Sequence, residues 1–477
     1  MKLLVGTWNV GASQPTQDID LSSWIRPPAE NNRETPDMIV LAFQEVTHPL
    51  TALAQSPVGK PGCPDSGPVH ELVSAAAAAI SSIYTEKEYT TVATHRLASM
   101  FITVFASVDV KDTILEIRTG DLGVGVAGIH GNKGAVAISL NIGIEAQRVF
   151  SLCLVGAHLS PHEGKSALAR RVEEGSFIFD HLGLAPLSSH RRDIKPLGLS
   201  SRDGHIPLRD SDDMDRSNSE HFKSIYSHDA IIFCGDLNFR LIKSAPALDG
   251  GNSNNDGEAN RASTSIDGAL PSQDMNESVN VPKLIHDYDE LELTRRGGIL
   301  PFSMFGEATV TFDPTYKLKP IRKRNSKAKE SPSILPSDPL LRPPHVAATS
   351  QMYSKSRRRA FPDRILYYAA DEDPAVATNH GSAKTSSRVE DTGSPIKSLY
   401  YTAVKEITWS DHRPVAAMLV LDENLIAGRM NSTRSKQVTL WLQRKARLLR
   451  FVDKAGLPLV ILLVMMLVII KLTYSRH

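Results

Sequence analysis

Short apolar runs recur along this chain, and most of them end beside a polar residue. They are bounded by turn residues and occupy residues 3–8, 38–44, 150–157, 230–235 and 414–421. They show little alternation between apolar and polar positions, which is expected for strands buried on both faces. Residues 101–106 and 135–141 predict two further strands, whereas residues 69–84 and 165–182 predict helices. Strands that alternate with helices indicate an α/β fold with helices covering the sheets.

Polar residues at the ends of these runs form the candidate active site. Each of the first four runs is followed by a carboxylate, carboxamide or imidazole side chain. These are Asn9, Glu45, His158, and Asp236 with Asn238. The last run is instead preceded by Asp411 and His412. One such residue at a strand end is usually structural or solvated. Several clusters of this kind suggest an active site, and their side chains are those that a metal-dependent phosphate site requires.

The carboxylates and carboxamides predict a magnesium site. Hydrolysis of a phosphate ester requires a cation that neutralises the phosphoryl oxygens and stabilises the leaving oxygen. Mg²⁺ prefers carboxylate and carboxamide oxygens. We therefore expect Glu45 to be a ligand, with Asn9 and Asp411 as further candidates.

The remaining polar residues predict the proton and phosphate chemistry. Asp236 has the chemistry to orient and deprotonate the attacking water, and Asn238 to hold phosphate or water. His158 and His412 can donate hydrogen bonds to phosphoryl oxygens, where charge develops. A catalytic imidazole usually needs an orienting carboxylate, and Asp363 is the candidate partner of His412.

Composition limits the class of protein. The chain has 477 residues, 41% of them apolar, which is enough for a large core and one to three domains. Its net charge of +1 gives no global attraction for nucleic acid. The cysteines Cys63, Cys153 and Cys234 form no disulfide framework and no zinc motif, which favours a reducing compartment. Residues 1–6 are too short for the apolar core of a signal peptide, so we expect no secretory leader.

Four polar stretches interrupt the α/β pattern. They are rich in Ser, Pro, Asn, Gly and charged residues, and they cover residues 187–220, 245–280, 319–354 and 370–396. Because such segments bury too little surface to offset chain entropy, we expect disordered insertions on surface loops.

The C-terminal region predicts attachment to a membrane. Residues 424–455 are basic with apolar positions at helical spacing, which favours an interfacial helix on anionic lipid over a solvated charged helix. Residues 457–470 are apolar, which is short against the roughly 20 residues of a spanning helix, although Lys471 can snorkel. We expect a tail anchor at residues 456–474; the alternative is a buried core helix. The short span favours the endoplasmic reticulum, with the mitochondrial outer membrane second.

The polar clusters lie within longer motifs that identify a family. The motifs are TWNVG at 7–11, FQEV at 43–46, GNKGAV at 131–136, AHL at 157–159, GDLNFR at 235–240, FDPTYK at 312–317, PDRIL at 362–366 and SDHRPV at 410–415. With them, the chain resembles the inositol polyphosphate 5-phosphatases, a branch of the endonuclease/exonuclease/phosphatase superfamily. The parts WN, QE, GDLN and SDH of these motifs are shared across the superfamily, whereas PTYK and GNKG select the inositide branch.

The resemblance covers residues 3–421 and implies a four-layer α/β sandwich. It also implies Mg²⁺ dependence and removal of the 5-phosphate from a phosphoinositide or an inositol phosphate, by a catalytic domain at residues 1–423. Asn9 and Glu45 then resemble the metal site and Asp236 the water activator. The resemblance implies pocket-lining or 4-phosphate contacts for Asn132, Lys133, Tyr316, Lys317, Lys355, Arg357 and Arg364.

Two stretches depart from the family pattern. Phe361 and Pro362 replace a Trp followed by Cys or Thr, and Pro362 removes an amide donor. Residues 170–172 read Arg-Arg-Val, so the chain lacks the Asn of an Arg-Asn pair that reaches the 1-phosphate side in the family. Neither departure changes a residue assigned to catalysis.

The expected substrate is phosphatidylinositol 4,5-bisphosphate at a membrane facing the cytosol. Three alternatives are a soluble inositol polyphosphate as the main substrate, a nuclease of the same fold, and an inactive inositide-binding scaffold. The near-neutral charge and the apolar tail disfavour a nuclease. The intact catalytic positions disfavour the scaffold. We expect no nucleic-acid partner, and the sequence indicates no particular protein partner.

Overall fold

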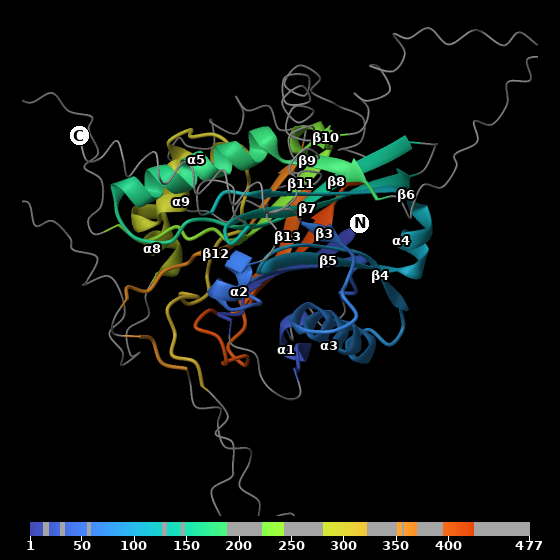
Figure 1. Cartoon of the computed structure of the whole chain (residues 1–477), viewed down its shortest axis with the longest axis horizontal. Coiled ribbons are helices and arrows are strands. Elements are labelled where there is room, and N and C mark those ends of the chain that lie inside the picture. The colour runs from blue at the N-terminus through green and yellow to red at the C-terminus, as the bar shows by residue number, and fades with distance from the viewer. Residues whose placement is uncertain are drawn as a thin grey trace, which may run out of the picture.

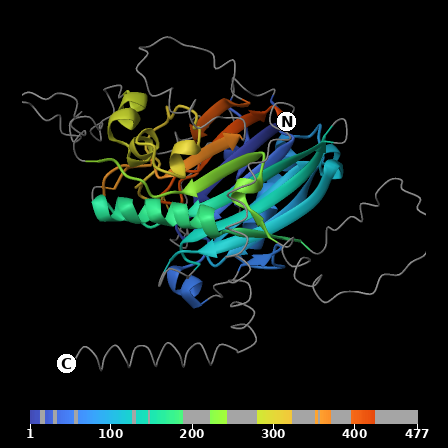
Figure 2. The same ribbon diagram turned by 90° about the horizontal axis from the view of Figure 1, so that it is seen from above.

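Two β-sheets lie face to face, and helices cover their outer faces (Figure 1, Figure 2). The computed structural model describes residues 1–12, 19–28, 34–54, 59–125, 131–144, 148–187, 222–242, 280–321, 351–354, 357–369 and 395–423. Each sheet has seven strands. The arrangement of helix, sheet, sheet and helix is the four-layer α/β sandwich that the family resemblance implied.

The first sheet joins the N-terminal strands to the last strands of the fold. Its order is β13 (Ile396–Ala403), β14 (Val415–Leu421), β1 (Lys2–Asn9), β2 (Met38–Gln44), β5 (Met100–Ser107), β4 (Tyr89–Leu97) and β3 (Lys60–Pro61). Only β1 and β2 run parallel, and Asn9 pairs with Gln44 at their ends. This register brings Asn9 and Glu45 to the same edge of the sheet.

The second sheet brings the other strand-end residues together. Its order is β10 (Lys223–Ser224), β9 (Gly183–Pro186), β6 (Ile114–Gly123), β7 (Gly134–Ile144), β8 (Arg148–His158), β11 (Ala230–Asp236) and β12 (Asp363–Ala369). β8 and β11 run parallel, with Asp236 beside His158. β12 runs antiparallel to β11, which places Asp363 opposite Asp236.

Helices on the two outer faces complete the layers. α1 (Ser22–Ile25) and α3 (Pro68–Ile83) lie on the first sheet, and α5 (Lys165–His181) and α9 (Glu290–Arg296) lie on the second (Figure 1). Shorter elements connect the strands: α2 (Pro49–Ala54), α4 (Val108–Thr113), α8 (Val281–Tyr288), and the 3₁₀ turns η6 (Ile225–Ser227) and η7 (Phe302–Met304). α9 begins where the Asp289 side chain accepts a hydrogen bond from the Glu292 amide, 3.0 Å away.

The core lies in three apolar layers. The inner faces of the sheets meet through residues such as Val40, Ile138 and Leu154. The outer face of the first sheet packs under α3, where Ile80 is buried, and the outer face of the second packs under α5, where Phe179 is buried. Both faces of the central strands are therefore covered, which explains why their sequences do not alternate.

The predicted strands and both predicted helices are confirmed, but the described fold reaches into all four predicted insertions, furthest into the one at 319–354. Residues 319–321 and 351–354 belong to the described fold, although the sequence placed them in an insertion of residues 319–354. The Lys319 backbone amide donates to the Met352 carbonyl at 2.8 Å, and the Gln351 side-chain carboxamide donates to the Ser410 carbonyl at 2.7 Å. These hydrogen bonds tie polar residues into the fold, which composition alone does not reveal.

Other expectations fall on residues outside the described ranges. These are the predicted juxtamembrane segment at 424–455, the predicted anchor at 456–474, and residues 188–220, 245–279, 322–350 and 370–394 of the predicted insertions. Among the helices that the structure describes, none combines the length and the apolar character needed to cross a bilayer.

Candidate active site

The candidate site forms where parallel strands of the two sheets end together. Asn9 is the last residue of β1 in the first sheet, and Asp236 is the last residue of β11 in the second. The carboxamide nitrogen of Asn9 donates to Asp236 Oδ2 at 2.8 Å, and both residues are only 1% exposed. One hydrogen bond therefore joins the sheets at the strand ends that the sequence singled out.

Asp236 lies at the centre of the site. Its Oδ2 is 3.3 Å from His158 Nε2 and 3.9 Å from His412 Nε2. Burial alone would raise the pKa of this carboxyl, but the two imidazoles and Lys133 outweigh burial and hold the pKa below its usual range. Asp236 is therefore ionised at neutral pH, which is the protonation state in which a carboxylate can accept a proton.

His412 is held by a buried carboxylate. Its Nδ1 is 2.9 Å from Asp363 Oδ2, which also accepts a 2.6 Å hydrogen bond from the Thr315 hydroxyl. The Trp8 indole donates to the His412 carbonyl at 3.1 Å. Burial would lower the pKa of His412, but Asp363 and Asp236 raise it to about 9. At neutral pH His412 is therefore an imidazolium that presents Nε2 toward Asp236, and the predicted pairing with Asp363 is present.

Unusual backbone conformations present two of the site residues. Glu45 has φ 53° and Asn238 has φ 58°, in the left-handed region that non-glycine residues seldom adopt. The Asn238 amide donates to Asp236 Oδ1 at 3.1 Å, and its side-chain nitrogen donates to the Leu159 carbonyl at 3.0 Å. Gly235 lets the backbone of this turn pass close to β8, because a Cβ at this position would lie 1.9 Å from the Ala157 carbonyl oxygen. Left-handed residues that are held in place by such bonds are frequent at functional sites.

Glu45 offers a carboxylate at the open side of the site. Its Oε1 is 3.6 Å from His158 Nε2 and 3.8 Å from Lys133 Nζ, and the side chain is 35% exposed. Burial disfavours its charge, but His158 and Lys133 together hold the pKa of Glu45 below its usual range. Lys133 also contacts the His158 ring, and burial lowers the pKa of its ammonium group.

The oxygen donors near Glu45 fit a hard divalent cation. Glu45 is ionised and accessible, and the side-chain carboxamide oxygen of Asn9 accepts the Gly11 backbone amide at 2.9 Å. Asp411 lies further along the rim, with its carboxylate 3.3 Å from Lys317 Nζ. A second group with three donor atoms within 4.8 Å of one another consists of Asp236, Asp363 and His412. The Glu45 group is the better cation site, because Asp363 and His412 already bond to each other.

The expected substrate contacts line the same opening in part. The Tyr316 ring lies 4.6 Å from the His412 ring, and Lys317 follows it. Lys133 reaches into the site between Glu45 and His158, and Asn132 precedes it on the same turn. Arg357 lies at the edge of a described segment, and Lys355 lies outside the described residues.

The expectation that Arg364 contacts substrate is wrong. Its side chain has no exposed surface, and its guanidinium donates to Glu307 at 2.6 Å and to Asp289 at 2.8 Å. These carboxylates neutralise the cation inside the fold. The sequence motif placed Arg364 beside Asp363, but adjacent residues of a strand point to opposite faces, and Arg364 points away from the site.

Arg240 is a neighbour of the site that sequence reasoning did not assign. Its guanidinium donates to the Asn238 carboxamide oxygen and lies 4.5 Å from the centre of the Tyr316 ring. The signal was present, because Arg240 closes the GDLNFR motif. Thr315, which donates to Asp363, likewise lies within the FDPTYK motif.

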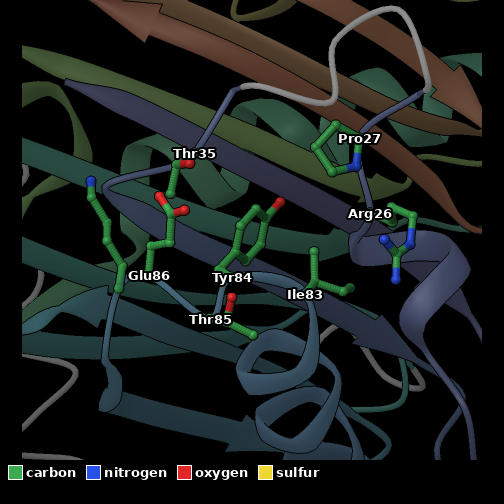
Figure 3. Close-up of a pocket in the computed structure, with 8 residues that line it drawn as sticks. Arg26, Pro27, Thr35, Ile83, Tyr84, Thr85 and Glu86 are labelled. Atoms are coloured by element: carbon green, nitrogen blue, oxygen red, sulfur yellow. The ribbon is translucent and has the colours of Figure 1, made fainter.

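A separate cavity lies beside the end of α3, where Ile83 and Tyr84 line it (Figure 3). Arg26, Thr35, Tyr84 and Glu86 are among its lining residues, and its volume is about 460 Å³. Tyr84 uses its hydroxyl to donate to the Ile25 carbonyl at 3.0 Å. None of the strand-end residues lines this cavity, so it is not part of the candidate active site.

Comparisons with known proteins agree with the geometry. The family described as Endonuclease/Exonuclease/phosphatase family 2 matches residues 6–418. Type I inositol polyphosphate 5-phosphatase 8 of Arabidopsis thaliana is 24% identical over 452 residues, which cover 88% of this chain and 70% of that protein. Polyphosphatidylinositol phosphatase INP53 of Saccharomyces cerevisiae is 25% identical, covering 67% of this chain and 22% of that protein. The chain therefore spans only part of the length of its curated relatives.

A solved structure shows the same fold. It is the inositol polyphosphate 5-phosphatase domain of SPsynaptojanin, in complex with inositol (1,4)-bisphosphate and calcium ion. The TM-score is 0.50 at 18% identity, and the match covers 95% of this chain and 93% of that domain. At this identity the likeness supports the fold alone.

Proposed function

From the premise that the chain belongs to the endonuclease/exonuclease/phosphatase family 2, we propose that it is a phosphomonoesterase that removes the 5-phosphate from inositides. The curated relatives named inositol polyphosphate 5-phosphatases support the substrate class. The observation that carries the reaction type is Asp236, an ionised buried carboxylate between Asn9, His158 and the imidazolium of His412. A base and several cationic or amide donors thus converge on one point, as hydrolysis of a phosphate ester requires.

In the proposed mechanism each residue acts through an atom already oriented by the fold. Asp236 takes a proton from the attacking water, and Asn9 holds its carboxylate in place. His412 donates from Nε2 to the phosphoryl oxygens, because Asp363 fixes its Nδ1. His158 donates from Nε2, which lies 3.3 Å from Asp236 Oδ2.

We propose that Mg²⁺ completes the site. Glu45 and Asn9 would hold it, with Asp411 near the rim, because these residues offer ionised or carbonyl oxygens. A bound Mg²⁺ would supply charge neutralisation for the phosphoryl and leaving oxygens.

Phosphate release from a panel of inositides tests this function. We expect release from substrates that carry a 5-phosphate, loss of release with a chelator, and recovery on adding Mg²⁺. Glu45→Gln removes the charged ligand but keeps the shape, so the Mg²⁺ concentration for half-maximal rate should rise by about tenfold or more. Activity on abasic DNA but on no inositide would instead indicate a nuclease. Lipid binding without any phosphate release would indicate an inactive scaffold.

We propose further that the substrate carries a 4-phosphate, with phosphatidylinositol 4,5-bisphosphate as the preferred substrate. Lys317 supports this proposal, since its ammonium group lies at the rim, 35% exposed, and is 5.7 Å from the Tyr316 ring centre. An exposed ammonium group at this place attracts a second phosphate as a point charge.

Lys317→Met should reduce kcat/KM for substrates with both 4- and 5-phosphates by about tenfold, and barely affect substrates without the 4-phosphate. The matched control is Lys87→Met, because Lys87 pairs with Asp37 at the far end of the sheet. An unchanged ratio between the two substrate classes in Lys317→Met would remove the basis for 4-phosphate recognition. Soluble and lipid forms of the same headgroup distinguish a soluble inositol phosphate from a lipid substrate.

We propose that residues 1–423 form the catalytic domain, residues 424–455 a basic juxtamembrane segment and residues 456–474 a tail anchor. Lys and Arg concentrated before the apolar stretch support a catalytic domain on the cytosolic side. The short span favours the endoplasmic reticulum, with the mitochondrial outer membrane second. As a flexible chain, the linker would reach roughly 30 Å, so the site can meet headgroups of the same membrane.

Deletion of residues 456–477 should move the protein to the soluble fraction while hydrolysis of a short-chain inositide stays within about twofold. Fractionation followed by alkaline carbonate extraction measures this. A full-length chain that carbonate removes from membranes would contradict the anchor.

A further inference from the structure

Two loops present the phosphate-binding side chains, and they touch each other. The first comprises residues 159–162 after His158, and the second comprises residues 237–240 after Asp236. The Leu159 amide donates to the Asp236 carbonyl at 3.1 Å. The Asn238 side chain donates back to the Leu159 carbonyl at 3.0 Å. The separation of the two loops therefore sets the separation of His158 from Asn238.

Behind these loops lies a buried ion pair between two helices. Arg171 of α5 and Glu290 at the start of α9 approach to 2.5 Å, and their side chains are only 0% and 4% exposed. In the sequence, Arg171 belongs to residues 170–172, which depart from the Arg-Asn pair that reaches the 1-phosphate side in the family. The structure instead directs its guanidinium into the protein.

Each residue of the ion pair is hydrogen-bonded to the backbone of one of the two loops. Arg171 donates to the His162 carbonyl at 2.8 Å and to the Ser160 carbonyl at 3.3 Å. The Glu290 carboxylate accepts the Arg240 backbone amide at 2.9 Å, through the same oxygen that meets Arg171. The pair thus links the loop after β8 to the loop after β11 by a continuous set of hydrogen bonds.

Stability alone does not account for this arrangement. Burying two charges costs desolvation energy, and well-packed apolar side chains of similar volume often stabilise a fold equally well. A guanidinium and a carboxylate add direction, because their hydrogen bonds fix where the bonded carbonyl and amide groups lie. The first loop needs such a restraint, since His162 has φ 88°, in the left-handed region.

We propose that Arg171 and Glu290 are positioning residues that fix the spacing between His158 and Asn238 for phosphoryl transfer. This inference rests on the proposed phosphatase function. Neither side chain touches substrate, so its loss should weaken turnover more than binding. A misplacement of about 1 Å in a catalytic group can cost about 10²-fold in rate.

Glu290→Gln tests the proposal in the full chain, because it keeps an acceptor for the Arg240 amide but removes the charge that holds Arg171. The matched control is Asp229→Asn, which neutralises a buried carboxylate that accepts the Ser151 amide at 2.8 Å. Asp229 precedes β11, at the opposite end of the strand from Asp236. The measurements are kcat and KM for a soluble inositol phosphate with a 5-phosphate, and the thermal midpoint.

Both variants should have a lower thermal midpoint, but only Glu290→Gln should lose kcat, by about 10–100-fold, with KM within about threefold. The double variant R171M/E290M replaces the pair by apolar side chains. It should recover the thermal midpoint without recovering kcat, which separates positioning from folding.

Three results would overturn the proposal. They are a Glu290→Gln variant with wild-type kcat, a Glu290→Gln loss of kcat matched by Asp229→Asn, and an R171M/E290M variant that recovers both midpoint and kcat. A wild-type chain that releases no phosphate from any inositide would instead refute the proposed function on which the inference rests.

Discussion

Asp236→Asn should lower kcat for 5-phosphate inositides by about 10²–10⁴-fold, the range that a general base contributes. The substitution keeps the shape and still accepts the hydrogen bond from Asn9, which is 2.8 Å in the wild type. It removes the charge that takes the proton and that raises the pKa of His412. Because the residue is buried and makes these contacts at the centre of the site, KM should change much less than kcat.

Asp229→Asn is again the matched control, since both aspartates flank the same strand and both are buried. Phosphate release under saturating substrate and Mg²⁺ measures the two variants side by side. If Asp236→Asn retains more than about a tenth of wild-type kcat, Asp236 is not the base.

Asp363→Asn should have the second largest effect, because it removes the carboxylate that holds His412 at 2.9 Å. We expect kcat at pH 7.5 to fall by about 10²-fold or more, since a neutral or misoriented imidazole is a poorer donor to phosphoryl oxygens. The Thr315 hydroxyl can still donate to the Asn side-chain oxygen, so the local fold keeps one of its two bonds.

The pH profile gives this prediction a sign. The pKa of His412 is raised to about 9 in the folded protein, above the ordinary value of 6.5. Its contribution to stability is therefore fully present below pH 6.5 and is lost as pH rises through about 9. The wild-type rate should fall along the same alkaline limb, and in Asp363→Asn that limb should move to lower pH. If the alkaline limb stays near pH 9 in the variant, it does not reflect a His412 pKa that Asp363 raises.

Asp236 sets the opposite limit. Its pKa is held below the ordinary value of 3.8, so its contribution to stability is present above about pH 4 and is lost as pH falls through the lowered value. Asp236 therefore gives no acid limb of the rate above about pH 4. At neutral pH, therefore, His412 is protonated and can donate, while Asp236 is ionised and can accept a proton.

The local pattern of the sequence was sufficient for the strands and for most of the site. A buried strand needs a continuous apolar run, and a polar residue at its end is visible as the first break in that run. Asn9, Glu45, His158 and Asp236 were all recognisable in this way, and the structure places them at strand ends.

The sequence could not determine which charged residues face the site and which are neutralised by ion pairs inside the fold. Arg364 follows Asp363 directly, yet it is neutralised by Glu307 and Asp289, which lie 57 and 75 positions away. Arg171 likewise finds Glu290 across 119 positions. Such pairings depend on how helices and loops pack against a sheet, and no local sequence pattern encodes that packing.

The sequence by itself therefore determined the elements and the chemical groups at their ends, because periodicity and burial are properties of short segments. The tertiary structure alone decided how these groups meet. Asn9 and Asp236 are 227 positions apart and belong to different sheets, and only the packing of one sheet on the other brings them to 2.8 Å. The same packing surrounds Asp236 with the cations that keep it ionised, so its chemistry arises from contacts between distant segments.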